Sequence, residues 1–237
     1  MINIINNILI SNGYKKIELV LQQDVADIYL FCPLTESKRE EYFVTIQLHT
    51  QSDSTAEHLL ENQVQDWFET ISRSGKVDQT FEKNCTMLLC HEENEISIKT
   101  ILKIEEDQYN FKKNVIACSQ QEVLSLQNYL TQKQVKNVTT KVINDIINVD
   151  NGRGFLNFKK NNKLQKDYYS LILKIALKLP FITYTPQEQE LSNLLNEIDN
   201  SLSPELASIY TQLTSSDVEW TETNSVQNIE IIWGKSV

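Results

Sequence analysis

Short apolar runs alternate with amphipathic segments over the first 132 residues, and this alternation restricts the fold more than any other feature. Four runs, at 27–32, 41–49, 84–91 and 113–118, have the length of strands and are rich in aliphatic, β-branched and aromatic side chains. The segments between them carry helix signals. The pattern therefore predicts an α/β protein, with an N-terminal mixed sheet and flanking helices.

Polar residues join the first two runs. The link Thr35–Glu40 is charged and hydroxyl-rich, and the run 27–32 ends at Pro33. A polar link of this length between two strand-like runs is typical of a hairpin connection. We therefore expect the runs 27–32 and 41–49 to pair in antiparallel fashion.

Three sequences of the form Ser/Thr-x-x-Glu mark helix starts, because the first side chain and the glutamate can each bond the other's backbone amide. They lie at Ser54–Glu57, Ser119–Glu122 and Thr185–Glu188. The first predicts a helix over about 55–73 that Gly75 ends. We expect its two aromatic side chains to anchor it to the sheet. Its apolar positions at helical spacing are Leu60, Val64, Trp67, Phe68 and Ile71.

The composition changes after residue 132. Residues 133–162 are rich in asparagine and lysine and are predicted to connect an α/β domain over 1–132 to a mainly helical region over 163–237. Within that region, 164–179 is apolar nearly all round up to Pro180. Such a helix is central in a core or covered by a partner.

The C-terminal region contains two further signals. Ser203-Pro204-Glu205 predicts a short helix that ends near Thr214. The run Asn228–Trp233 is β-like, and predicts a C-terminal strand that completes a sheet or adds a strand to a partner.

The charge balance is acidic, with a net charge of −10, so a phosphate backbone would repel the chain as a whole. Lysines gather in only one part of the sequence, where a basic patch could form. No apolar run is long enough to span a bilayer, and the N-terminus lacks the features of a signal peptide, so we expect a cytoplasmic protein. The clustered lysines are Lys159, Lys160, Lys163, Lys166, Lys174 and Lys178.

Metal, cofactor and nucleotide motifs are missing from the sequence. Cys85, Cys90 and His91 do not form a pair of zinc-ligand motifs, and the four cysteines suit buried thiols. Gly152-Arg153-Gly154 lacks the third glycine of a dinucleotide fingerprint and the Gly-Lys-Ser/Thr of a P-loop. We expect no catalytic, cofactor-binding or metal-binding residues.

A nuclease-like metal site is the one catalytic alternative that the sequence leaves open. Asp27 and Glu41, with Lys38, can be arranged as carboxylates and a lysine around two strands. Glu41 is not followed by the alternating lysine that such a strand carries, so this arrangement is disfavoured. The histidines form no triad with a serine or cysteine.

One dense stretch separates the predicted helix that ends near residue 106 from the strand at 113–118. It contains three carboxylates, two aromatic residues and two lysines within nine positions, but no nucleophile, metal cage or phosphate loop. By its chemistry it is a structural junction or a docking surface. Its residues are Glu105, Glu106, Asp107, Tyr109, Phe111, Lys112 and Lys113.

This stretch resembles a hallmark of the middle components of bacterial ABC-three-component systems, which are related to Lamassu-type defence operons. The preceding layout, with Tyr42-Phe43-Val44 and the Trp67-Phe68 helix, is similar as well, and the resemblance covers roughly residues 25–130. Gln108 departs from the pattern, where proline would be expected.

The resemblance implies a subunit without catalysis of its own. It would bridge an SMC-like ABC ATPase, expected as a dimer, and an effector such as a nuclease, in defence against phages or plasmids. DNA would be contacted mainly through the complex, and no membrane or cofactor is implied. The alternatives are a diverged Mg²⁺-dependent nuclease-like enzyme and a stand-alone adaptor that binds a toxin.

Overall fold

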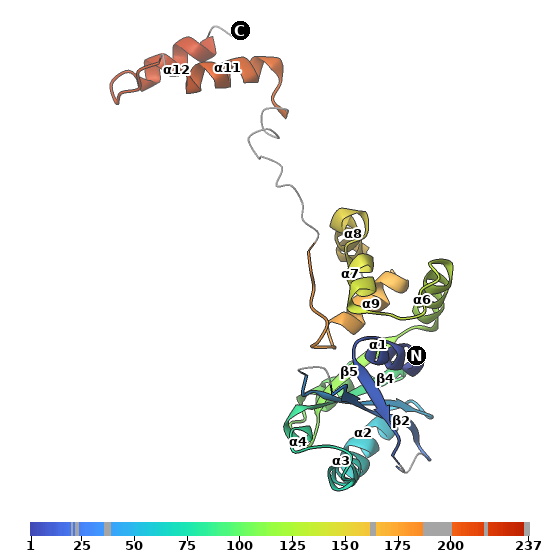
Figure 1. Cartoon of the computed structure of the whole chain (residues 1–237). Coiled ribbons are helices and arrows are strands. Elements are labelled where there is room, and N and C mark those ends of the chain that lie inside the picture. The colour runs from blue at the N-terminus through green and yellow to red at the C-terminus, as the bar shows by residue number, and fades with distance from the viewer. Residues whose placement is uncertain are drawn as a thin grey trace. The chain divides into compact units, whose positions relative to one another are not determined.

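The computed structural model describes residues 1–19, 21, 24–35, 39–161, 165–186, 201–215 and 218–234 (Figure 1). The chain divides into two compact units, Met1–Gln187 and Glu188–Val237. The first unit contains the sheet, and the described part of the second is helical. The predicted fold class, a mixed sheet with flanking helices followed by a mainly helical C-terminal region, is confirmed.

Five strands form one sheet in the order β1-β2-β3-β4-β5. Both β1–β2 and β2–β3 pair antiparallel, as predicted for the second pair, whereas β3, β4 and β5 run parallel. The parallel strands are joined through helices, as parallel connections require. The strands are β1 (Tyr14–Ile17), β2 (Ala26–Pro33), β3 (Tyr42–Leu48), β4 (Cys85–Glu92) and β5 (Lys112–Cys118).

One face of the sheet is covered by the helices that connect β3 to β5. Met87 and Leu89 of β4 point to this face, where Trp67 and Phe81 are buried, so Trp67 anchors its helix as predicted. The helices are α2 (Asp53–His58), a π-helical turn η1 (Leu59–Gln63), α3 (Val64–Arg73), α4 (Phe81–Asn84) and α5 (Ile98–Glu106).

The other face is covered by helices from both ends of the unit, which lie together in Figure 1. Leu88 and Cys90 of β4 point to this face, as the alternation of a strand demands. The helices are α1 (Ile2–Ser11), α6 (Gln120–Gln132), α7 (Thr140–Ile147), a 3₁₀ turn η2 (Val149–Gly152), α8 (Arg153–Asn161) and α9 (Tyr168–Ala176).

The asparagine- and lysine-rich segment contributes to this second core. Val138, Ile143 and Ile146 are buried there against α9, so much of the range 133–162 is packed helix. Its two glycines have structural roles: Gly152 has φ of +81°, and a Cβ on Gly154 would lie 2.6 Å from Val149.

Two helix starts differ in detail from the sequence predictions. The cap of α2 is Ser52 rather than Ser54, since its hydroxyl accepts from the Thr55 amide at 3.2 Å. The apolar helix begins at Tyr168, where Asp167 forms a capping box, and is central in the second core. The helix predicted after Thr185 falls on 187–200, outside the described residues.

The second unit contains α11 (Pro204–Thr214) and α12 (Ser225–Gly234). Ser203 caps α11 as predicted. The predicted C-terminal strand over Asn228–Trp233 is wrong, because these residues lie within α12. Short apolar runs of this kind satisfy both helical and strand spacing.

A buried charge holds α6 to α9. Glu122 is fully buried and completes the predicted capping box with Ser119. Its carboxylate also accepts from Ser170 Oγ at 2.5 Å and from Lys174 Nζ at 2.9 Å. Burial by itself raises the pKa of Glu122, but the hydrogen bonds outweigh it and hold the pKa below its ordinary value of 4.5.

This network predicts a pH dependence of stability. Because the folded-state pKa of Glu122 is lowered, its contribution is complete above pH 4.5 and is lost as the pH falls through the range below that value. Glu122→Gln should lower the free energy of unfolding at pH 7 by roughly 2–3 kcal/mol. Urea unfolding between pH 7 and pH 3 should then show a smaller loss for the variant than for the wild type. Parallel pH profiles would contradict the assignment.

Candidate functional site

The dense stretch between α5 and β5 divides into an inner and an outer half. The inner half begins with Lys113, whose side chain is fully buried. Its ammonium donates to Asp107 Oδ1 and to the Tyr109 carbonyl at 2.5 Å each, and to the Phe111 carbonyl at 3.1 Å. A buried ammonium is tolerated only when its donors are satisfied in this way. Lys113 therefore fixes the turn over 107–111, in which Asn110 adopts φ of +63°.

Glu105 connects the end of α5 to two other elements. Its carboxylate accepts from the Val115 amide at 2.7 Å, on β5, the last strand of the sheet. The same carboxylate accepts from Lys178 Nζ at 2.6 Å. The Glu105 carboxylate thus satisfies a backbone amide on the edge of the sheet, where no further strand is paired.

Phe111 completes the inner half. It is 1% exposed, and its ring lies edge-on to Phe68, with 5.1 Å between centroids. Phe81 lies 6.2 Å from the same ring and stacks on Phe68. These aromatic contacts attach the turn to the core beneath α3.

The outer half consists of Glu106, Tyr109 and Lys112, which are exposed. Tyr109 is 77% exposed, and within α5 the exposed apolar residues Ile98 and Leu102 lie about two turns and one turn before Glu106, on the same side of the helix. A shallow cavity of about 570 Å³ lies beside Tyr109, between α5 and Leu60. We call the set Ile98, Leu102, Glu106 and Tyr109 the α5 surface; Lys112 alternates with Lys113 on β5 and points to the other face of the sheet.

The carboxylates considered for a nuclease-like site do not meet. Asp27 pairs in register with Gln47 near one end of β3, whereas Glu41 precedes the other end. Six residues of extended strand separate these positions by roughly 20 Å. Lys38 lies outside the described residues, and the described part of the chain contains no group of three or more potential metal ligands.

The cysteines and His91 are poorly suited to nucleophilic chemistry. Burial raises the pKa of Cys90 to about 12 and of Cys118 to about 11, so both are thiols at neutral pH. Burial also lowers the pKa of His91, whose Nδ1 lies 2.7 Å from the Glu92 carbonyl. The ring is therefore neutral and donates through Nδ1.

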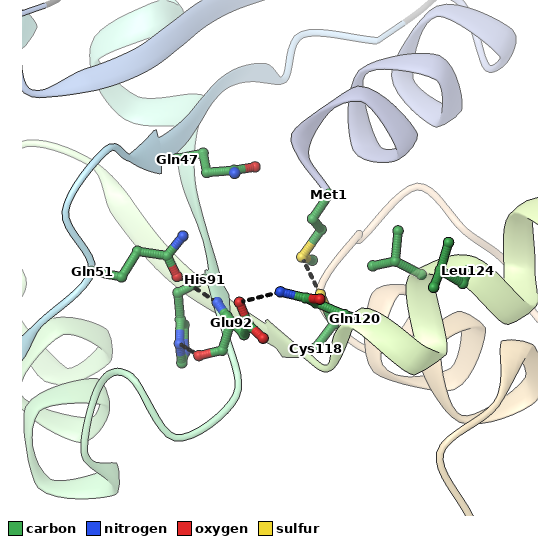
Figure 2. Close-up of a pocket in the computed structure, with 9 residues that line it drawn as sticks. Met1, Gln47, Gln51, His91, Glu92, Cys118, Gln120 and Leu124 are labelled. Atoms are coloured by element: carbon green, nitrogen blue, oxygen red, sulfur yellow. Dashed lines mark hydrogen bonds between the residues drawn. The ribbon is translucent and has the colours of Figure 1, made fainter.

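A polar pocket of about 320 Å³ lies at the carboxyl ends of β3, β4 and β5 (Figure 2). Ligands of α/β proteins commonly bind at this edge. Here several polar groups bond one another: Gln51 Oε1 accepts from the Glu92 amide at 2.5 Å, and Gln120 Nε2 donates to the Glu92 carboxylate at 3.2 Å. The buried Nε2 of His91 has no hydrogen-bond partner among the described residues. We assign no chemistry to this pocket.

The clustered lysines are largely compensated by carboxylates. Lys166 pairs with Glu93, Lys174 with Glu122 and Lys178 with Glu105. Lys159 and Lys160 are exposed at the end of α8, and Lys163 lies outside the described residues. The predicted basic patch is thus reduced to the end of one helix in the described part of the chain.

Comparison with known proteins adds one finding. Residues 41–146 match the family model of ABC-three component (ABC-3C) system Middle Component 1. This range runs from the residue before β3 into α7 and includes the whole stretch between α5 and β5. The resemblance seen in the sequence is therefore confirmed. Neither the curated proteins nor the solved structures yield a match.

Substitutions in the two halves of the stretch are expected to differ strongly in their effect on stability. Phe111→Ala removes a buried aromatic ring and should lower the free energy of unfolding by roughly 3–5 kcal/mol. Tyr109→Ala removes an exposed ring and should change it by no more than about 0.5 kcal/mol. Urea unfolding of the two variants at pH 7 measures both. Equal losses would show that the turn is packed differently.

Proposed function

We propose that this chain, with its Middle Component 1 segment at 41–146, is the non-catalytic middle subunit of a bacterial defence complex. It would bridge an SMC-like ABC ATPase and an effector, with a nuclease as the expected effector. In this role it holds the effector inactive against the ATPase heads. DNA sensing by the ATPase then shifts the assembly and frees the effector to act on phage or plasmid DNA.

The α5 surface is the observation that carries this proposal. Ile98 and Leu102 expose apolar area along α5 up to Glu106, which lines the same cavity as the exposed ring of Tyr109. Aromatic side chains such as tyrosine are common at the energetic centres of protein interfaces. Tyr109 is 77% exposed, so most of its ring is accessible to a partner.

Charge supports contact with proteins more than with DNA. The chain has a net charge of −10, and three of its clustered lysines are paired with carboxylates. An acidic subunit is attracted to basic partner surfaces and repelled by a phosphate backbone. DNA contact through the ATPase is consistent with this balance. No helix among the described residues has the length and apolarity to cross a bilayer.

Native mass spectrometry of the full chain, co-expressed with the products of its flanking reading frames, tests the proposal. We expect a stable complex that contains a large coiled-coil ATPase. One small partner without an ATPase would instead favour the toxin-binding adaptor. A monomer or homodimer that binds none of the products of the flanking reading frames would overturn the bridging role.

Tyr109→Ala tests the α5 surface within that complex. Loss of a central aromatic contact should weaken binding of one partner by about tenfold or more. Leu124→Ala provides the control, since Leu124 is an exposed apolar residue on α6, at the opposite face of the sheet. Titration of each purified variant with the partner measures the affinities. Unchanged affinity for Tyr109→Ala would show that the α5 surface does not bind this partner.

A further inference from the structure

The helices α11 and α12 form a hairpin with a very small core. Among the described residues of this hairpin, only Ile209 and Ile232 are buried. Helices of ten or eleven residues are marginal on their own in water, and so small an apolar core adds little. The hairpin therefore needs additional apolar contact to be stable.

A row of exposed apolar side chains lies along each helix. In α11 it consists of Leu206 and Tyr210, which are 45% and 40% exposed. In α12 it consists of Val226, Ile229 and Trp233, which are 67%, 45% and 52% exposed. Spacings of three and four residues place each row on one side of its helix.

The two rows lie on the same side of the hairpin. At about 100° per residue, each row is centred roughly 60–120° round its helix from the inward-facing residue, Ile209 or Ile232, in the same rotational sense. The helices run antiparallel (Figure 1), and in an antiparallel pair that sense leads to one common side. We call Leu206, Tyr210, Val226, Ile229 and Trp233 the hairpin face.

The charge of the hairpin indicates what covers this face. From Ser201 to Gly234 the sequence contains no lysine, arginine or histidine. A second copy of the chain would bring a second set of carboxylates and no basic side chain from this segment to the contact, which is unfavourable. A surface with basic side chains at its rim would complement them. The carboxylates of this segment are Glu205, Asp217, Glu219, Glu222 and Glu230.

We propose that the hairpin face docks into an apolar groove, rimmed by lysine and arginine, on a partner protein of the complex. The inference rests on the proposed function and adds to it a second contact, separate from the α5 surface. Bridging requires two such contacts. The hairpin also lies outside the matched range 41–146, so it would bind through residues that the family match does not include.

Two isoleucines in α12 provide a matched test in the full chain. Ile229 belongs to the hairpin face, whereas Ile231 lies on the other flank, beside Thr211 and Val218, and their exposed fractions are 45% and 49%. Both substitutions to serine have the same effect on helix propensity. Binding of each variant to the purified products of the flanking reading frames is measured by titration at 50 and 500 mM NaCl.

We expect Ile229→Ser to weaken binding about tenfold and Ile231→Ser by less than threefold. Wild-type binding should also weaken at the higher salt concentration. If both variants bind as tightly as the wild type, or if both lose affinity to the same extent, the inference is overturned and the proposed function is not. A wild-type dimer that Ile229→Ser dissociates would identify a second copy as the occupant and also overturn it. Failure of the wild type to bind either neighbour would overturn the proposed function together with this inference.

Discussion

The buried ammonium of Lys113 is the interaction on which the junction between α5 and β5 depends. It gathers the Asp107 carboxylate and the carbonyls of Tyr109 and Phe111 into one turn. With the turn fixed, Phe111 reaches the aromatic cluster under α3, and Glu105 reaches the edge of β5. An unpaired ammonium at this position would be costly, so the charge and the shape of the turn are coupled.

The same turn separates structural from interacting residues. Because Lys113 and Phe111 point inward, Tyr109 is left on the surface beside Glu106, at the end of α5. A rigid element that presents an exposed aromatic ring reduces the entropy lost on binding. The hairpin differs, since its small core makes binding and folding depend on each other. The proposed bridging subunit thus combines one preformed surface with one that a partner would stabilise.

Local patterns in the sequence were sufficient for four of the five strands and for the main helices between them, but not for α1 and β1, which were not predicted. The alternation of apolar runs predicts β2 to β5, and the Ser119–Glu122 capping box is present as expected. Long-range contacts were not accessible in this way. The partners of Lys166, Lys174 and Lys178 are 73, 52 and 73 residues distant, so the sequence could show the lysines but not their compensation. The division of the dense stretch into two halves also depends on the tertiary position of each side chain. The strand predicted over Asn228–Trp233 was wrong because this run satisfies both strand and helix spacing.

Hydrogen–deuterium exchange of the full chain, alone and within the co-expressed complex, shows whether the junction between α5 and β5 is covered by a partner. We expect slower exchange in the complex for the peptide that covers α5 and the following turn, residues 98–112. The buried strand β4 should exchange equally slowly in both states. Unchanged exchange over 98–112 in an intact complex would contradict the claim that this junction is a docking surface.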